Sequence, residues 1–600
     1  MLDKAIMRNA KRKKKNLHMG WIDYKKAYDS VPHSWIIHCL KIHKVADNII
    51  YMIEQSMKSW STSLTIQGKA LGQIQIKKGI FQGDTLSPLL FIISMNPLTT
   101  LLRNHKACYN INKRTKVNHL LYMDDLKLYG KNKQQLDSLI QTVRIYSDDI
   151  KMEFGLNRCS SVIIKKGKLD RQGNIELPSN ETIQELDNTD LYKYLDILEN
   201  SEIGNTEMKN KIKQEYYTRV KKVLRSQLNS GHMTTAINAW AVAKIRYGAD
   251  ILQWTKQEAR EMDRKTRKIL TMNKALHPRA DIDRLYVPRK LGGRGLINIE
   301  ECIETETQGL ADYIQTLEGN LRDALIEERI CHTSKPWKSK QDRIKERMDN
   351  WHNKALHGQY VESIKENEQK VSWNWLKIGQ LKKETEGLIT AAQDQALPTN
   401  SHKVRICKQD ISPMCRMCGE REETVNHIIS ECSKLAQKEY KGRHDKVAAA
   451  VHWGLCRKYG IECSNKWYEH KAERVIENEE IKILWDFPIQ TDHVIEHRKP
   501  DILIMNKKAR KTMIVDIAVP ADKRTKSKEQ EKRERYQDLG REISKMWKCK
   551  MKVIPIVVGA LGAITQGPCL KELDDPIGQD ILQKITVLGS ARILRKVLEI

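Results

Sequence analysis

The segment that decides the fold is LLYMDDLKLY, residues 120–129, in which two apolar runs flank Asp124 and Asp125. This pattern predicts two β-strands joined by a tight acidic turn. Adjacent aspartates repel each other, and a divalent cation between them relieves that repulsion. Phosphoryl transfer uses such an arrangement, with two Mg²⁺ ions holding the attacking and leaving oxygens. The alternative is an ordinary hairpin turn without a ligand, and the segment alone leaves both interpretations open.

Two upstream segments favour the metal-binding interpretation. Residues 20–29 read GWIDYKKAYD, where an apolar strand end delivers Asp23 just before a helical pattern. Residues 78–91 read KGIFQGDTLSPLLF, in which two glycines permit close backbone approach to a ligand. Between those glycines, Gln82 offers an amide to a sugar or base. We expect Asp23 to complete the metal-ligand set of the acidic turn from a neighbouring strand.

Bulk properties point to a nucleic-acid-binding protein of several domains. A chain of 600 residues exceeds the size at which one core keeps growing, so three or four domains are expected. No apolar run approaches a membrane span and the start lacks a signal peptide, so we expect an intracellular chain. The 105 Lys and Arg against 76 Asp and Glu give a net charge of +29, which attracts a polyanion. A basic ribosome-associated or membrane-surface protein is the alternative.

Composition divides the chain into four stretches. Residues 1–200 mix short β-rich runs with helical patterns, and residues 205–400 read as almost wholly helical and basic. A short cysteine-bearing stretch, 405–460, follows. Residues 465–600 alternate helix and strand patterns. We expect these stretches to correspond to the domains.

The cysteine-bearing stretch carries a metal-site pattern, Cys415-x2-Cys418-x8-His427-x4-Cys432. Such spacing is typical of tetrahedral zinc, and four protein ligands leave no open position, so the ion is expected to be structural. Unrelated reduced cysteines are the alternative. Three further residues lie just beyond with less regular spacing and are alternative ligands: His444, His452 and Cys456.

The last stretch carries two aspartates on β-rich runs. RKPDILI contains Asp501 and TMIVDIAV contains Asp516. A hairpin would bring them side by side to hold one or two Mg²⁺ ions, with a helical stretch at 526–547 and a strand at 553–558 completing an α/β nuclease core. Alone the signal is weak, because two aspartates near strand ends occur in many folds.

Taken together, these segments resemble a known family. The runs at 20–29, 78–91 and 120–129, in this order and spacing, resemble the palm motifs of reverse transcriptases of the non-LTR retrotransposon group. The order of knuckle and Arg/Lys-Pro-Asp motif resembles the branch with a restriction-like endonuclease. The resemblance implies an α+β multidomain fold: a ferredoxin-like βαββαβ palm, a helical thumb and connection, a small zinc knuckle and an α/β restriction-like endonuclease.

The resemblance also implies residue roles. In the polymerase, the catalytic ligands of two Mg²⁺ ions would be Asp23, Asp124 and Asp125, and the nucleotide-binding residues would be Tyr28, Gln82 and Gly83. Tyr28 would lie beneath the incoming sugar and exclude a 2′-hydroxyl. In the nuclease, the catalytic residues would be Asp501, Asp516 and Lys532. Position 518, where a lysine is usual, is alanine, and Lys532 is preferred to Arg535 because arginine does not readily act as a base.

Two departures from the family stand out. In the segment 192–198, which resembles the hairpin that grips the primer, Asp196 replaces the usual glycine and adds bulk and a charge that repels the primer. The first palm carboxylate, at position 23, leaves no room for amino-terminal fingers. We therefore expect either part of a longer polyprotein or a decayed copy.

The function these features imply is target-primed reverse transcription. The nuclease would nick target DNA, and the freed 3′-hydroxyl would prime copying of an RNA template from dNTPs. Such a protein would act in the nucleus, with possible passage through the cytoplasm, and no membrane is involved. One alternative is an inactive remnant that only binds nucleic acid. Another is a group II intron maturase, whose nuclease uses a histidine-rich metal site that the final stretch lacks.

Overall fold

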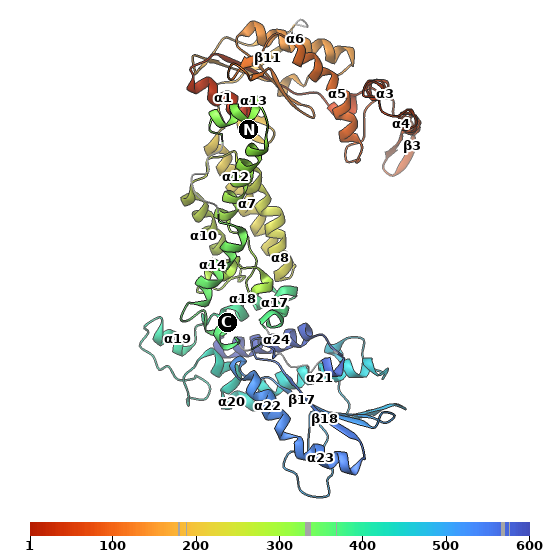
Figure 1. Cartoon of the computed structure of the whole chain (residues 1–600), viewed down its shortest axis with the longest axis vertical. Helices are drawn as coiled ribbons and strands as arrows, with labels where there is room; N and C mark the ends of the chain where they lie inside the picture. Colours follow the sequence, from red (N-terminus) through yellow and green to blue (C-terminus); the bar gives the residue numbers. More distant parts are fainter. Residues whose placement is uncertain are drawn as a thin grey trace. The chain divides into compact units, whose positions relative to one another are not determined.

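Strands and helices alternate near both ends of the chain, and helices fill the middle (Figure 1). The computed structural model describes residues 1–177, 181–187, 189–330, 338–365, 367, 369–565, 571–574 and 576–599. Between Glu199 and Val475 the described residues form helices and no strand, which confirms the helical expectation for 205–400. No helix in the described part of the chain is long and apolar enough to cross a membrane.

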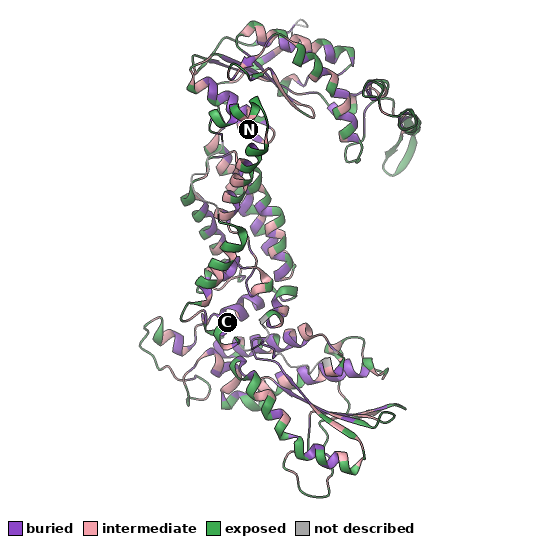
Figure 2. Ribbon diagram, viewed as in Figure 1, coloured by how far each residue is buried: buried purple, intermediate pink, exposed green. Residues whose placement is uncertain are grey.

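The chain divides into two units with separate cores. Unit 1 comprises Met1–Gln214, Arg246–Trp254 and Ile303–Pro336, and unit 2 comprises Glu215–Ile245, Thr255–Cys302 and Trp337–Ile600. In each unit the central strands of the main sheet and the inward faces of the helices are buried, whereas the β2–β3 hairpin of unit 1 (Ser61–Ile66, Lys69–Gln75) is exposed (Figure 2). In the sequence, the α-helices that come after the strands of unit 1 and before those of unit 2 are α7 (Asn205–Arg225), α8 (Ser230–Ala236), α9 (Val242–Ala249), α10 (Lys256–Met272), α11 (Ile282–Tyr286), α12 (Ile299–Thr316), α13 (Asn320–Glu327), α14 (Lys340–His352), α15 (Gln359–Ser363), α16 (Gln369–Ser372), α17 (Asn374–Ile378), α18 (Lys383–Gln393), α19 (Asn400–Arg405), α20 (Ser433–Leu435) and α21 (Lys441–Lys458).

The sheet of unit 1 is built from strands distant in sequence. Its central order is β8-β1-β7-β6, with β11 and β10 beyond β8, and β9 also pairs with β8. The strands are β1 (Leu17–Ile22), β6 (His119–Tyr122), β7 (Asp125–Gly130), β8 (Ser160–Lys165), β9 (Lys168–Asp170), β10 (Ile175–Glu176) and β11 (Thr182–Glu185). The other elements are α1 (Leu2–Arg12), α2 (Ala27–Ser30), α3 (His33–Ile42), α4 (Asp47–Ser59), α5 (Ser87–Asn104), α6 (Lys133–Asp149) and the small hairpins β2–β3 (Ser61–Ile66, Lys69–Gln75), β4–β5 (Tyr109–Asn110, Lys116–Val117) and β12–β13 (Tyr192–Tyr194, Ile197–Glu199).

The two faces of this sheet bury different kinds of side chain. On one face Ile22, Leu126 and Leu128 share a core with α5 and α6. On the other face Trp21 pairs with Lys127 across β1 and β7. Because side chains alternate along a strand, the second face is the one that continues to Asp23 and Asp125.

A fully buried lysine organises that second face. Lys127 Nζ lies 2.7 Å from Asp3 Oδ1 of α1 and 2.6 Å from Glu199 Oε1 of β13. Trp21 Nε1 also donates to Glu199 Oε1, at 2.9 Å. Burial raises the pKa of Glu199 to about 8. Burial also opposes the charge of Asp3, but Lys127 together with hydrogen bonds from the neighbouring side chains lowers the pKa of Asp3. Lys127 is thus matched by two acidic side chains, and burial disfavours the charged form of Glu199 more than that of Asp3.

A glycine with positive φ fixes the loop that follows α3 and α4. Gly79 has φ +87, and its N–H donates to Val31 O at 2.7 Å. A Cβ at this position would lie 2.8 Å from the Asp29 backbone. The requirement for glycine at this position is therefore explained by its close approach to the chain itself, and the expected approach to a ligand stays a prediction. Gly83, with φ +93, has nothing within 4 Å of the same added atom.

The sheet of unit 2 has the order β14-β15-β16-β17-β18 and helices on both faces. Its elements are β14 (Val475–Glu477), β15 (Ile481–Trp485), β16 (Ile502–Asn506), β17 (Lys511–Ala518), α22 (Thr525–Arg535), α23 (Gln537–Met546), β18 (Lys550–Val557) and α24 (Gln579–Leu598). One face packs against α21 and the other against α23. The expected helical stretch and following strand are confirmed, with a break at Tyr536 between two helices.

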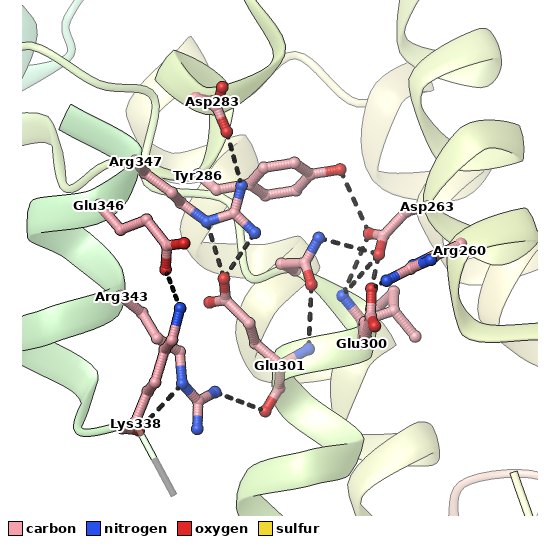
Figure 3. A network of polar contacts seen from close by, with 12 residues as sticks. Arg260, Asp263, Asp283, Tyr286, Glu300, Glu301, Lys338, Arg343, Glu346 and Arg347 are labelled. Carbon is pink, nitrogen blue, oxygen red and sulfur yellow. Dashed lines mark hydrogen bonds and ion pairs between the residues drawn. The ribbon is translucent and has the colours of Figure 1, made fainter. Parts of the chain in front are cut away.

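A polar network also joins the helices of unit 2 (Figure 3). Asp263 of α10 is buried, which raises its pKa to about 6, and it accepts the Ile299 N–H at 3.1 Å. It thereby caps the first turn of α12, where an acidic group is favoured. Arg347 of α14 donates to Glu301 at 2.7 Å, so α10, α12 and α14 are tied together by paired charges.

Replacing Lys127 tests the buried triad. We expect Lys127→Met to lower the free energy of unfolding by about 3–5 kcal/mol, because it leaves a carboxylate buried without its cation. Urea denaturation of the full chain measures this. Lys131→Met, at an exposed position, is the matched control and should change stability by less than about 0.5 kcal/mol. Adding Asp3→Asn should recover part of the loss, and no recovery would contradict the pairing.

Paired glycine substitutions test the backbone contact at Gly79. Both Gly79→Ala and Gly83→Ala place a side chain at positive φ, which costs about 1–2 kcal/mol. Only the first also drives a Cβ into backbone, so we expect Gly79→Ala to lose about 1–3 kcal/mol more. Thermal unfolding of the two variants side by side gives the difference. Equal losses would show that the contact with Asp29 does not constrain the loop.

Candidate functional sites

Three aspartates meet at one edge of the unit 1 sheet. Ile22 of β1 pairs with Leu126 of β7, so the next positions, Asp23 and Asp125, follow in the same register. Asp124 lies in the two-residue turn between β6 and β7, which Tyr122 and Asp125 close. The expectation of an acidic hairpin with Asp23 on a neighbouring strand is confirmed.

The carboxylates are close enough to influence one another. Burial raises the pKa of Asp125, and the charges of Asp124 and Asp23 raise it further. Burial and Asp124 raise the pKa of Asp23 as well, against the lowering effect of Arg158. Arg158 Nη1 lies 3.0 Å from Asp23 Oδ2. Three carboxylates beside one arginine leave excess negative charge and oxygen ligands, which suit a hard divalent cation.

Tyr28 lies beside this edge on a rigid support. Its ring stacks on Phe91 of α5 with centroids 4.7 Å apart, and its hydroxyl is 3.8 Å from Met123 Sδ in the acidic turn. The Tyr28 carbonyl accepts the Ile80 N–H at 2.8 Å. Gln82 therefore follows a segment paired to Tyr28, and both Gln82 and Gly83 are exposed.

The β12–β13 hairpin is anchored next to the same edge. Tyr192 stacks on Trp21 at 4.7 Å and donates its hydroxyl to Arg158 O at 2.7 Å. The turn residues Leu195 and Asp196 have φ +47 and +58, the conformation for which Gly or Asn is preferred. Asp196 pairs with Lys193 at 3.0 Å. The hairpin expected from sequence is present, with Asp196 at its tip.

The cysteine pattern forms a cluster in unit 2. The ligand atoms of Cys415, Cys418, His427 and Cys432 all lie within 4.8 Å of one another. Two separations are 3.3 Å, from Cys418 Sγ to His427 Nε2, and 4.0 Å, from Cys415 Sγ to Cys432 Sγ. Tetrahedral zinc with thiolate and imidazole ligands needs separations of about 3.3–3.8 Å. The residues present therefore fit a metal ion.

A second pair of aspartates meets on the unit 2 sheet. Ile502 of β16 pairs with Val515 of β17, which places Asp501, just before β16, next to Asp516 of β17. Asp516 Oδ2 lies 2.5 Å from Lys532 Nζ, and Tyr536 donates its hydroxyl to Asp516 Oδ1 at 2.9 Å. Burial and Asp501 raise the pKa of Asp516, against the effect of Lys532. The structure thus brings together the three residues expected in the nuclease.

His444 joins this second site, which sequence reasoning missed. Its Nε2 lies 3.1 Å from Asp501 Oδ2 and 3.2 Å from Ile517 O. Although burial opposes its charge, the contact with Asp501 raises the pKa of His444 to about 9. The suggestion that His444 is an alternative ligand of the cysteine cluster is wrong, because its ring is directed to Asp501. No sequence spacing pointed to a partner 57 residues away.

An open pocket adjoins His444 and Lys532. The end of β17 and the following loop form one wall. Five cationic side chains line it: Lys441, Arg443, Arg524, Lys528 and Lys532. Among the described residues that line it, Glu431 is the one acidic residue, so the pocket carries a net positive charge, which suits a phosphodiester backbone.

Comparisons with known proteins agree with the first site. Residues 2–195 match the family described as reverse transcriptase (RNA-dependent DNA polymerase). The chain is 23% identical over 472 residues to the retrovirus-related Pol polyprotein from type-1 retrotransposable element R2 of Nasonia vitripennis, covering 74% of this chain and 43% of that protein. It is 22% identical over 567 residues to the corresponding polyprotein of Bradysia coprophila, covering 89% of this chain and 59% of the relative.

Similarity to solved structures is slight. Apo telomerase from Candida tropicalis aligns at 11% identity over 58% of this chain and 55% of that chain, with a TM-score of 0.29, which bears on neither fold nor site. The chain spans about half the length of the curated relatives it matches, between 43% and 59% for the two described above. Residues 2–195 thus match the reverse transcriptase family, and most of the chain is similar to the R2 retrotransposon polyproteins at 22–23% identity.

Proposed function

We propose that this chain is an RNA-directed DNA polymerase of a non-LTR retrotransposon and that the edge formed by β1 and the β6–β7 hairpin is its catalytic site. The observation that carries the proposal is the meeting of Asp23, Asp124 and Asp125 at that edge, within a segment matching the reverse transcriptase family. RNA template and dNTPs are the substrates.

Each residue at this edge has a role in the proposal. The three aspartates would hold two Mg²⁺ ions, which supply the Lewis acidity for phosphoryl transfer. Arg158 fixes the orientation of Asp23 through its 3.0 Å contact. Tyr28, held flat against Phe91, offers a rigid surface to the sugar of the incoming nucleotide. Gln82 and Gly83, exposed on the adjacent loop, would contact that nucleotide.

The arrangement of unit 1 supports a palm of the ferredoxin-like type. The elements β1, α5, β6, β7, α6 and β8 follow one another along the chain, and the strand order is β8-β1-β7-β6. The helices from α7 to α18 would then serve as thumb and connection. In the cysteine cluster, three thiolates and one imidazole favour Zn²⁺, and four protein ligands favour a structural role.

Primer extension tests the polymerase. The full chain, given an RNA template with an annealed DNA primer, dNTPs and Mg²⁺, should extend the primer. Asp124→Ala/Asp125→Ala should reduce the rate by about 1000-fold or more, because several kcal/mol of charge stabilisation are lost. The control Asp148→Ala/Asp149→Ala removes two exposed aspartates from the end of α6 and should extend normally.

The outcome of this assay separates two functions. The positive φ and charge of Asp196 in the hairpin tip favour a second candidate, a protein that binds nucleic acid without copying it. No extension by the wild-type chain, with RNA binding retained, would establish that candidate and overturn the polymerase. Extension that survives the double substitution would overturn the assigned residues.

We further propose that Asp501, Asp516 and Lys532 form a DNA endonuclease that nicks target DNA. The support is the pairing of the two carboxylates on adjacent strands, with Lys532 at 2.5 Å and a cationic pocket beside them. Bound Mg²⁺ would activate water and stabilise the leaving oxygen. Lys532 is close enough to a phosphate held by this pair to neutralise developing charge.

Nicking of supercoiled plasmid DNA in the presence of Mg²⁺ tests the nuclease. We expect Asp501→Asn and Lys532→Met each to slow nicking by about 100-fold or more, since each removes a charge that stabilises the transition state. Asp538→Asn, at an exposed position of α23, should nick at the wild-type rate. Nicking that is unchanged in Asp501→Asn would place the chemistry elsewhere.

A further inference from the structure

A second group of metal-ligating side chains lies in unit 2, apart from the cysteine cluster. His452 and Cys456 project from α21, and His470 comes from the segment before β14. One ligand atom from each lies within 4.8 Å of the other two. His452 and Cys456 are fully buried and His470 is half-buried. Three potential ligands therefore converge where solvent is largely excluded.

The separations within this group resemble those of the cysteine cluster. His452 Nδ1 lies 2.8 Å from His470 Nε2 and 3.5 Å from Cys456 Sγ. The separations in the first cluster are 3.3 and 4.0 Å. Zinc bonds of the usual length require about 3.3–3.8 Å between ligands, so the two rings need to separate by only about 0.5 Å.

The local fold holds these residues in place. His452 and Cys456 are four residues apart, which puts them on one face of α21. The segment that leads to His470 is bound back onto the same helix: Ile461 N donates to Cys456 O at 2.9 Å, and Trp453 Nε1 donates to Ser464 O at 2.7 Å. A half-buried thiol, Cys463, lies on this returning segment between Ile461 and Ser464, the two residues that are hydrogen-bonded to α21.

A simple hydrogen bond between the two imidazoles is the competing explanation. It would account for the 2.8 Å contact. It would leave the Cys456 thiol with only a weak contact, 3.5 Å from His452 Nδ1, and it would not account for the second thiol, Cys463, on the returning segment. A metal ion uses all of these groups, and one thiolate or two with two imidazoles is a ligand set typical of Zn²⁺.

We propose that His452 Nδ1, Cys456 Sγ and His470 Nε2 bind a second structural Zn²⁺ ion, and that Cys463 Sγ, which lies outside this three-residue group, moves in as the fourth ligand. The ion would clamp residues 461–470 to α21. The same helix carries His444 eight residues earlier, two turns away, so the clamp would steady the helix that reaches Asp501. The inference does not depend on polymerase or nuclease activity, because zinc content reports it directly.

Zinc content of the full chain is the first measurement. After purification with Zn²⁺ and removal of free metal, we expect two zinc ions per wild-type chain by elemental analysis. His470→Gln, a half-buried position on a loop, should retain one. Cys418→Ser, in the first cluster, should also retain one, and the double variant should retain none. Circular dichroism of each variant checks that the fold survives.

Cobalt substitution gives a test that needs no variant. Titration of the metal-free chain with Co²⁺ should show two equivalents bound tetrahedrally, the second with weaker sulfur-to-cobalt absorption because it has fewer thiolates. One equivalent in wild type, lost in Cys418→Ser and unchanged in His470→Gln, would overturn the proposal and leave the hydrogen-bonded pair. Cys463→Ser should weaken the second site at least about tenfold, and unchanged affinity would overturn its assignment as the fourth ligand.

Discussion

The antiparallel pairing of β1 with β7 is the constraint on which the first site depends. It sets Trp21 opposite Lys127, and the same register carries on to Asp23 and Asp125. Lys127 is fully buried, and a charge in that position is stable only with its carboxylate partners from α1 and β13. The register, the hairpin above the sheet and the amino-terminal helix are therefore fixed by one side chain, two residues from the acidic edge.

The two aspartate sites differ in how far the repulsion between their carboxylates is offset by cationic side chains. At the edge of unit 1, three carboxylates share one contacting arginine, so their mutual repulsion remains for a bound cation to relieve. In unit 2, Asp501 and Asp516 face His444 and Lys532, and charge is nearly balanced within the protein. Asp516 therefore already has a cationic partner in Lys532, and Asp501 has one in His444.

The sequence predicted those parts of each site that are encoded by residues close together in the chain. The acidic turn at Asp124 and Asp125 is encoded by adjacent residues, and apolar alternation identified the strands that bear Asp501 and Asp516. Asp3, Lys127 and Glu199 lie far apart along the chain and read individually as surface charges, so the triad could not be predicted. His444 was missed for the same reason, since only the packing of α21 on the sheet brings it to Asp501. At Gly79, sequence indicated a close approach but not which backbone approaches.

The tip of the β12–β13 hairpin holds two residues in a backbone conformation that is unfavourable for them. Both turn residues hold positive φ, which costs free energy for Leu195 and Asp196 alike. The turn nevertheless forms, because its base is fixed: Tyr192 stacks on Trp21, and Glu199, which pairs with Tyr192 across the hairpin, accepts from Trp21 and Lys127. Asp196 lies 3.0 Å from Lys193 and 3.8 Å from Lys211, so two lysines offset the charge that it adds to the tip.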